Sequence, residues 1–503
     1  MTHQLPTPPP DSTAVLPNGS RVRLAARRFP GGLLESTLRP ALARIHVDER
    51  SLPPAQGILE VDGPASAALA RRLTDQDLAV TVPSAQPEPP CLTHLSVVVP
   101  VRDRAEALDR LLCRLLGGLP EERRPRVIVV NDASADAPRL SAVTARHGAH
   151  QVDLPVNVGP AGARNAGLAH VETPFVAFVD SDVAVTAEQL ERLLAEFSDP
   201  LLAVTAPRVV APRTPARTRT DPPAWGVHAA LARYERWMGP LDVGSTPGLV
   251  GPSRRLTYVP SACWVARTST VGDGFSAELR VGEDVDLVWR LTDAGWRVRY
   301  VPDVNVAHTT REDAAGWWRQ HAGYGLSSAP LAQRHPGRLA PARYNATGLA
   351  VAASMMAPWP VFALTSAAAY SLSWWRLRRR MDRFDSADAV AGRLAWAGLS
   401  ANVGQTASWS WRYGLPVLLP AALVCRPARR LLLRGLVVDT VVTVSRRSRR
   451  NGDVLDVLAV VAGAAALPAR AAENAAFAWG VLSGCLRYRT LAPLIPALIR
   501  RPS

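Results

Sequence analysis

The stretch Phe178-Val179-Asp180-Ser181-Asp182-Val183 ends an apolar run that begins at Thr173. Such a run predicts a buried strand, with both carboxylates emerging where that strand ends. Parallel α/β sheets bind ligands at the carboxyl ends of their strands. Two acids one residue apart can hold a divalent metal ion against a diphosphate, although an isolated Asp-x-Asp pair often only caps a turn. The residues around the pair must decide between these interpretations.

Strands and helices are predicted to alternate over residues 94–335. Strand-like runs begin at Leu95, Arg126 and Gln151, and helical patterns cover residues 104–116 and 161–170. This alternation predicts an α/β fold, a parallel sheet with helices on both faces. No Gly-x-Gly-x-x-Gly follows the first strand, so the dinucleotide-binding fingerprint is absent.

Composition excludes several kinds of chemistry. The chain has 503 residues and a formal net charge of +15, and every basic residue is arginine. Without lysine there is no Schiff base, no pyridoxal phosphate attachment and no phosphate loop ending in Gly-Lys. The five cysteines form no Cys-x-x-Cys pair, which argues against a zinc site or a disulfide framework and fits a reducing cytosol.

The amino-terminal part divides into three predicted segments. Residues 1–13 are polar and proline-rich and lack the apolar core of a secretory signal, so we expect a disordered leader. Residues 14–83 predict a small α/β, winged-helix-like domain, which is either a stabilising cap or a docking module for a peptide. Residues 84–93 are a proline-rich linker.

Residues 340–503 predict a helical, apolar and arginine-rich region. Residues 347–375 carry no charge and are followed by arginines, which predicts a membrane span that leaves the bilayer at its cytoplasmic face. Pro358 and Pro360 interrupt this stretch, so a buried or interfacial helix pair remains an alternative. The basic run at 446–450 would attract anionic lipid or form a solvated linker. We therefore expect a bacterial, membrane-associated protein on the cytoplasmic face of the cell membrane.

Four segments together resemble the signatures of glycosyltransferase family 2. They are Ser96-Val-Val-Val-Pro-Val-Arg-Asp-Arg104, Val130-Asn-Asp-Ala-Ser134, Asn157-Val-Gly-Pro-Ala-Gly-Ala-Arg-Asn-Ala-Gly167 and Phe178-Val-Asp-Ser-Asp182. The resemblance covers roughly residues 94 to 330. It implies a GT-A type nucleotide-binding fold and a uridine diphosphate sugar as donor.

The resemblance implies which residues bind the nucleotide sugar. Asp132 would accept a hydrogen bond from the uracil imide, and Gly159 would let the backbone approach the ligand at a helix amino terminus that favours anions. Trp264 would lie at the sugar pocket. The full set is Pro100, Arg102, Asp132, Gly159, Arg164, Asp180, Trp264 and Glu283.

A divalent metal ion, Mn²⁺ or Mg²⁺, is the cofactor that the resemblance implies. Asp180 and Asp182 would supply hard oxygen ligands and the diphosphate would supply others. In several relatives a histidine placed like His308 completes the site, and a neutral imidazole suits Mn²⁺. An ordinary surface or core histidine is the alternative interpretation.

In the family, the acid at the position of Asp284 is the general base. It takes a proton from the acceptor hydroxyl in a single displacement, which inverts the anomeric configuration. Without the resemblance, Glu283 and Asp284 would be a charge pair that complements a helix dipole. Trp317 and Trp318 resemble, with a different residue order, an acceptor-binding element of processive relatives.

The whole-chain layout is similar to that of the glycosyltransferases of the mycofactocin system, which add β-linked glucose to a peptide-derived redox cofactor. The predicted function is therefore an inverting, metal-dependent hexosyl transfer, from a UDP-sugar such as UDP-glucose to that cofactor. A cell-envelope glycosyltransferase acting on a lipid-linked or polysaccharide acceptor is the alternative, and a non-catalytic binding protein is a third. Nucleic acid is not an expected partner, since residues 94–335 show no basic stripe interleaved with aromatics.

Overall fold

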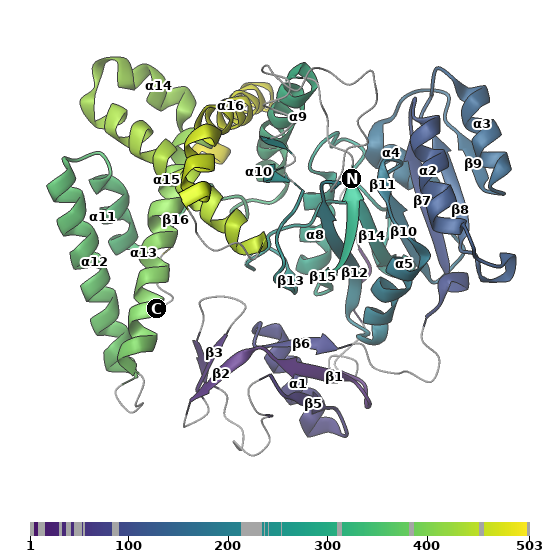
Figure 1. Cartoon of the computed structure of the whole chain (residues 1–503), viewed down its shortest axis with the longest axis horizontal. Coiled ribbons are helices and arrows are strands. Elements are labelled where there is room, and N and C mark those ends of the chain that lie inside the picture. The colour runs from purple at the N-terminus through teal and green to yellow at the C-terminus, as the bar shows by residue number, and fades with distance from the viewer. Residues whose placement is uncertain are drawn as a thin grey trace. The chain divides into compact units, whose positions relative to one another are not determined.

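The computed structural model of the chain describes residues 5–8, 16–29, 33–36, 42–44, 53, 56–82, 90–212, 234–235, 237–239, 241–252, 254–308, 314–381, 387–451 and 457–499. These residues fall into two compact units (Figure 1). The sheet unit comprises Met1–Arg219 and Gly239–Thr310, and the helical unit comprises Thr220–Met238 and Arg311–Ser503. Most of the predicted leader and residues 84–89 of the predicted linker lie outside the described residues.

A mixed sheet forms the core of the sheet unit. Its strand order is β11-β15-β12-β14-β10-β7-β8-β9, and β13 pairs with β15. Strands β10, β7, β8 and β9 are parallel neighbours, whereas β14 runs antiparallel between β10 and β12. The strands are β7 (Leu95–Val101), β8 (Arg126–Asn131), β9 (His150–Asp153), β10 (Phe175–Val179), β11 (Val183–Ala184), β12 (Leu202–Val210), β13 (Gly248–Val250), β14 (Cys263–Arg267) and β15 (Arg297–His308).

Burial explains why these segments are strands. Every residue of β10, Phe-Val-Ala-Phe-Val, is buried, as expected for a strand covered on both faces. Because β10 pairs in parallel with β7, Asp180 follows the carboxyl end of a central strand. The predicted α/β architecture and the predicted position of the acidic pair are confirmed. Contrary to the prediction, the sheet is not parallel throughout, because β11, β13 and β14 pair antiparallel with their neighbours.

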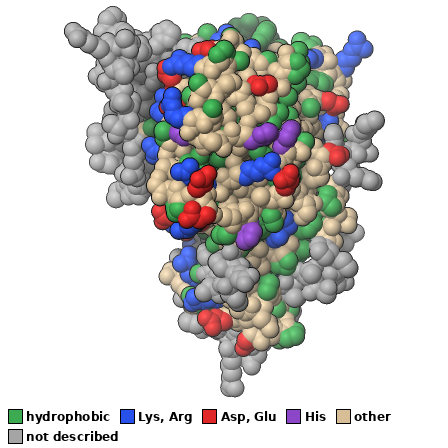
Figure 2. All heavy atoms as spheres, turned by 90° about the vertical axis from the view of Figure 1, so that its right-hand side faces the viewer, with side chains coloured by type: hydrophobic (Ala, Val, Ile, Leu, Met, Phe, Trp, Pro, Cys, Tyr) green, Lys and Arg blue, Asp and Glu red, His purple; other side chains and the backbone are tan. Residues whose placement is uncertain are grey.

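Amphipathic helices cover the sheet. In α2 the buried leucines are Leu108, Leu111, Leu112, Leu115 and Leu116, whose spacing of three to four places them on one face. The helices of this unit are α1 (Pro64–Asp75), α2 (Ala105–Leu116), α3 (Ala137–Arg146), α4 (Gly159–Leu168), α5 (Ala187–Leu194), α7 (Thr268–Val271) and α8 (Glu283–Asp293). On the face shown in Figure 2, arginine and acidic side chains are interspersed rather than gathered by sign.

The amino-terminal residues form a small α/β module. Helix α1 accompanies an antiparallel sheet of order β5-β1-β6, and a second sheet has the order β2-β3-β4. Its strands are β1 (Arg21–Leu24), β2 (Ala26–Phe29), β3 (Leu33–Ser36), β4 (Leu42–Arg44), β5 (Ile58–Glu60) and β6 (Ala79–Val82). The winged-helix type stays a prediction, since parts of residues 14–83 lie outside the described ranges.

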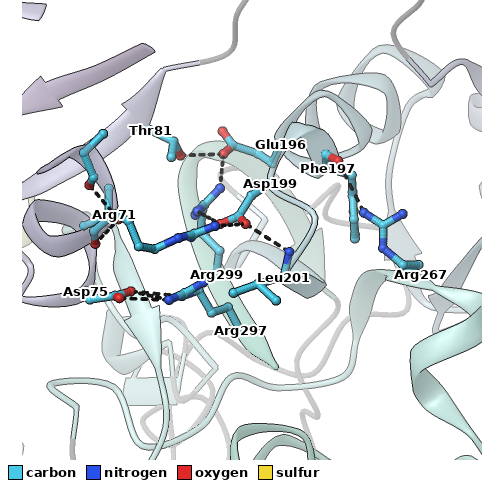
Figure 3. A network of polar contacts seen from close by, with 12 residues as sticks. Arg71, Asp75, Thr81, Glu196, Phe197, Asp199, Leu201, Arg267, Arg297 and Arg299 are labelled. Atoms are coloured by element: carbon cyan, nitrogen blue, oxygen red, sulfur yellow. Dashed lines mark hydrogen bonds and ion pairs between the residues drawn. The ribbon is translucent and has the colours of Figure 1, made fainter. Parts of the chain in front are cut away.

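A buried ion network joins this module to the large sheet (Figure 3). Arg71 donates two hydrogen bonds to Asp199, at 2.8 and 2.7 Å. Arg299 of β15 donates to Glu196 and to Asp199, and Arg297 pairs with Asp75 of α1. Burial raises the pKa of Asp199, but the Arg71 hydrogen bond and the Arg299 charge outweigh it and lower the pKa to about 2. Three arginines thus face three carboxylates, and the module is fastened to the sheet unit.

The helical unit is larger than the predicted carboxyl-terminal region. Besides Thr220–Met238 it includes Arg311–Ser503, so α9 and α10, which lie before residue 340, group with the later helices. Its elements are α9 (Ala314–Leu326), α10 (Ser328–Arg334), β16 (Arg343–Tyr344), α11 (Ala346–Ser354), α12 (Trp359–Arg380), α13 (Ala387–Arg412), α14 (Leu415–Val424), α15 (Arg426–Asn451), α16 (Val457–Arg487) and β17 (Ala497–Leu498).

The predicted membrane span at 347–375 is wrong. The stretch forms two helices, α11 and α12, which are separated by a turn at residues 355–358. Pro358 and Pro360 explain the break, because the residue before a proline avoids the helical conformation and proline favours the first turn of a new helix. Within the described residues, no helix combines the length and the apolar character needed to cross a bilayer.

We expect Arg71→Met to destabilise the sheet unit by about 3 kcal/mol, because it leaves buried carboxylates without one of their partners. Urea unfolding followed by tryptophan fluorescence would measure the loss. Arg23→Met, on the exposed side of β1, is the matched control and should change the unfolding free energy by less than about 0.5 kcal/mol. Equal effects of the two substitutions would contradict a fastening role for the network.

Candidate functional site

Two acids and a histidine meet at the carboxyl end of β10. Asp180 and Asp182 follow that strand, and β11 begins immediately afterwards. In the antiparallel ladder of β11 and β15, Val183 lies opposite His308. This register brings ligand atoms of Asp180, Asp182 and His308 within 4.8 Å of one another. His308 Nε2 lies 3.3 Å from Asp182 Oδ1.

The donor set fits a divalent cation. Two carboxylates and one imidazole suit Mn²⁺ or Mg²⁺. The guanidinium of Arg104 contacts Asp182 and holds a positive charge beside the carboxylates, where a metal ion would place its own. Arg104 was not among the predicted site residues. Its place in the loop after β7, next to Asp103, is the one signal in the sequence that could have indicated it.

Arg164 of α4 bridges the acidic pair and the next acidic segment. Its Nη2 donates to Asp180 Oδ1 at 2.7 Å, and its Nη1 donates to Glu283 Oε1 at 2.8 Å. The side chain is 3% exposed and its guanidinium lies over the ring of Phe275. Burial lowers the pKa of Arg164, but Asp180 and Glu283 more than offset this, so the pKa is raised. Arg164 is therefore a permanent cation that positions two carboxylates.

Asp284 lies beside the same strands. Its Oδ2 accepts a hydrogen bond from the backbone N–H of Ser261 at 3.3 Å, and the next carbonyl, that of Ala262, accepts from the N–H of Asp180. Helix α8 begins one residue earlier, after Gly282, whose φ of 87° is a conformation that favours glycine. Burial, and then the charge of Glu283, raise the pKa of Asp284 to about 7. A carboxylate with this pKa can accept a proton near neutral pH.

Asp132 shapes the glycine loop. Its two carboxylate oxygens accept hydrogen bonds from the backbone N–H groups of Val158 and Gly159, at 2.7 and 3.0 Å. Gly159 has a φ of 83°, again in the region that favours glycine. Asp132 is buried, at 6% exposure, so its first role in the structure is to hold the start of α4. Each carboxylate oxygen keeps a lone pair for a further donor.

The other predicted residues occupy different environments. Pro100 is the sixth residue of β7, and Arg102, whose side chain is 51% exposed, lies 3.5 Å from Asp103 in the loop that follows. Trp264 is fully buried and stacks on Phe275, 5.9 Å between ring centroids, so it supports the site from within the core.

The two predicted acceptor-binding tryptophans belong to the helical unit. Trp317 is 3% exposed, and its indole N–H donates to Glu235 at 2.7 Å, so the structure gives it a packing role rather than an open face. Trp318 is 40% exposed and keeps a free surface.

We expect Mn²⁺ to bind at the acidic cluster. In the presence of uridine diphosphate, electron paramagnetic resonance should show that Asp182→Asn and His308→Ala each weaken Mn²⁺ binding by about tenfold or more, the equivalent of about 1.4 kcal/mol. His147→Ala is the control, because Asp109, Cys113 and His147 form a second potential metal-binding group elsewhere on the sheet unit. Weakening by His147→Ala alone would place the ion at that second group instead.

The match to a known protein family covers residues of the site described above. The family described as Glycosyl transferase family 2 matches residues 96–244, which include the acidic pair and the glycine loop. The mannosyltransferase PcManGT of Pyrobaculum calidifontis is 16% identical in sequence, with a TM-score of 0.35, and covers 61% of this chain and 86% of that one.

Two known relatives differ in how much of their length is similar to this chain. The "Succinoglycan biosynthesis protein ExoO" of Rhizobium meliloti is 32% identical over 108 residues, which cover 21% of this chain and 31% of that protein. The "Pre-mycofactocin glycosyltransferase" of Mycobacterium tuberculosis is 36% identical over 457 residues, 89% of this chain and 92% of its own length. Similarity of this extent includes both units, and the protein belongs to glycosyltransferase family 2.

Proposed function

We propose that this glycosyltransferase is an inverting, metal-dependent enzyme that transfers glucose from UDP-glucose to the mycofactocin precursor and builds β-linked glucose units. The observation that carries the proposal is Asp284, a carboxylate with a pKa raised to about 7, which is linked through Ser261 and Ala262 to the acidic pair. The similarity to the pre-mycofactocin glycosyltransferase supports the acceptor.

In this proposal Asp284 is the general base. Its carboxylate takes the proton of the acceptor hydroxyl as that oxygen attacks the anomeric carbon, and the bond to the diphosphate breaks on the opposite side. One displacement inverts the configuration, so an α-linked donor yields a β-linked product. The Ser261 N–H keeps the Asp284 carboxylate oriented while it accepts the proton.

The donor would bind along the carboxyl ends of the strands. Asp132 retains acceptor capacity for the imide N–H of uracil, and Arg102 is exposed near the same edge of the sheet. The start of α4 favours the negative charge of the diphosphate. Asp180, Asp182 and His308 would hold the divalent ion, which would neutralise charge on the departing diphosphate.

A cell-envelope glycosyltransferase is the second candidate. The apolar and arginine-rich helical unit would suit a lipid-linked acceptor, and the short similarity to ExoO points the same way. We also propose that the protein is located at the cytoplasmic face of the bacterial membrane. This location would serve either acceptor.

The test is release of uridine diphosphate from UDP-glucose with Mn²⁺ and the peptide-derived cofactor precursor as acceptor. Asp284→Asn should lower turnover by a factor on the order of 10² to 10⁴ while nucleotide binding persists, because only proton removal is lost. Asp303→Asn, an exposed acid of β15, is the matched control and should leave turnover unchanged. Nuclear magnetic resonance of the product would show whether the new linkage is β.

The possible outcomes of this test separate the choice of acceptor from the inverting mechanism. Turnover with a lipid-linked or polysaccharide acceptor alone would support the envelope function. Full activity of Asp284→Asn, or an α-linked product, would contradict the inverting mechanism.

The pH dependence of transfer gives a separate test. Asp284 acts as a base only when it is ionised, so kcat/KM should rise with pH through about 7. Glu283→Gln removes a negative charge beside Asp284 while Arg164 stays, so the pKa of Asp284 should fall and the rise should move to lower pH. Glu188→Gln, an exposed acid of α5, should not move it. An identical acid limb in wild type and Glu283→Gln would exclude Asp284 as the titrating base.

A further inference from the structure

Helix α12 exposes an apolar surface that ordinary soluble helices bury. Of its 22 residues, Ala369 alone is buried. Trp359 is 64% exposed and Leu364 is 72% exposed, and Leu372 and Trp375 are also exposed. A helix of a globular protein normally buries an apolar stripe, and a large exposed apolar surface marks an interaction site. We therefore expect the exposed apolar side of α12 to be covered by another molecule or by a lipid surface.

Helix α14 repeats the pattern more strongly. Its sequence Leu-Pro-Val-Leu-Leu-Pro-Ala-Ala-Leu-Val contains no polar side chain. Its exposed residues include Val417 at 65%, Leu419 at 55%, Leu423 at 79% and Val424 at 87%. These side chains are not needed to hold α14 in place, because Leu415 and Ala422 do so by packing against α15.

Helix α15 connects the two surfaces. Arg434 of α15 donates hydrogen bonds to the carbonyls of Met355 and Ala357, just before α12 begins, at 2.9 and 2.8 Å. The start of α12 and the buried side of α14 thus adjoin the same helix, since Phe362, Leu418 and Leu431 belong to one cluster. In Figure 1, α14 lies above α15 and α12 lies below it. On α15 itself, Leu433, Val437 and Val441 are exposed at a spacing of four, which is one helical face.

The charge around these helices is strongly positive. From residue 341 to residue 445 the chain has twelve arginines and four aspartates, with no lysine and no glutamate. Seven of these arginines lie where the apolar surfaces end, at residues 376 and 378–380 of α12 and at residues 426, 429 and 430 of α15. The guanidinium of Arg379 lies 4.0 Å from the ring centroid of Trp375. Tryptophan beside arginine, next to exposed leucine and valine, is typical of a membrane interface.

We propose that α12, α14 and residues 426–441 of α15 form a lipid-binding surface that docks on an anionic bilayer without crossing it. The exposed apolar side chains would enter the boundary between headgroups and acyl chains, and the arginines would bind the lipid phosphates. A surface made for a second copy of the chain would not need this excess of one charge, because two like-charged surfaces repel. The inference specifies the membrane location proposed above and does not depend on which sugar or acceptor the enzyme uses.

The experiment is vesicle flotation of the full-length protein. Wild-type protein should float with vesicles of phosphatidylcholine mixed with phosphatidylglycerol, and much less with phosphatidylcholine alone. Leu423→Glu combined with Val424→Glu should reduce flotation with the anionic vesicles at least tenfold. Val156→Glu, a substitution at a 62% exposed valine of the sheet unit, is the matched control and should float like wild type.

A second pair of variants tests the charge. Arg379→Glu combined with Arg380→Glu should reduce binding to anionic vesicles and leave the remaining binding less sensitive to salt. Release of uridine diphosphate with a water-soluble acceptor should be unchanged in all these variants, which separates loss of docking from loss of catalysis or folding.

Three results would overturn the proposal. The first is no flotation of wild-type protein with either vesicle, and the second is equal flotation of wild type and the Leu423/Val424 variant. The third is a wild-type dimer in analytical ultracentrifugation that this variant converts to monomer, which would assign the surface to a second copy of the chain.

Discussion

The buried guanidinium of Arg164 is the interaction on which the site depends. Four carboxylates, those of Asp180, Asp182, Glu283 and Asp284, gather at one edge of the sheet, where their like charges repel one another. Arg164 neutralises part of this charge from inside the core, where water cannot screen it. The negative charge that remains favours binding of a divalent cation. The charge of Glu283, together with burial, also raises the pKa of Asp284 to about 7, which suits a base at neutral pH.

Position relative to Arg164 accounts for the different properties of these acids. Asp180 and Glu283 each accept a charge-assisted hydrogen bond from Arg164. Asp284 has two backbone N–H donors instead, at Ser261 and Val285, and burial with the charge of Glu283 raises its pKa. Arg164 thus pairs with Asp180 and Glu283, whereas the hydrogen bonds to Asp284 come from the backbone.

The two units differ in how they manage charge. In the sheet unit, Arg71 and Asp199 belong to a balanced buried network that fastens the small module. In the helical unit, Arg470 is likewise enclosed by Asp439 and Glu473, but many other arginines lie at helix ends beside exposed apolar side chains. Paired charges stabilise the interior, whereas unbalanced positive charge beside an apolar surface attracts an anionic partner.

Local sequence patterns were sufficient to predict part of the fold and part of the site. The sequence by itself determined the buried β10, the acids that follow it, the glycine loop and the family, because periodicity and short motifs are local properties. The tertiary structure alone decided that Arg164 meets Glu283, 119 residues away, and that Trp317 is buried. Pro358 and Pro360 already indicated from the sequence that the uncharged stretch at 347–375 would be interrupted, and the structure decided that it forms two separate helices rather than a span. Burial, pKa and partner choice arise from contacts distant in sequence, and no local pattern encodes them.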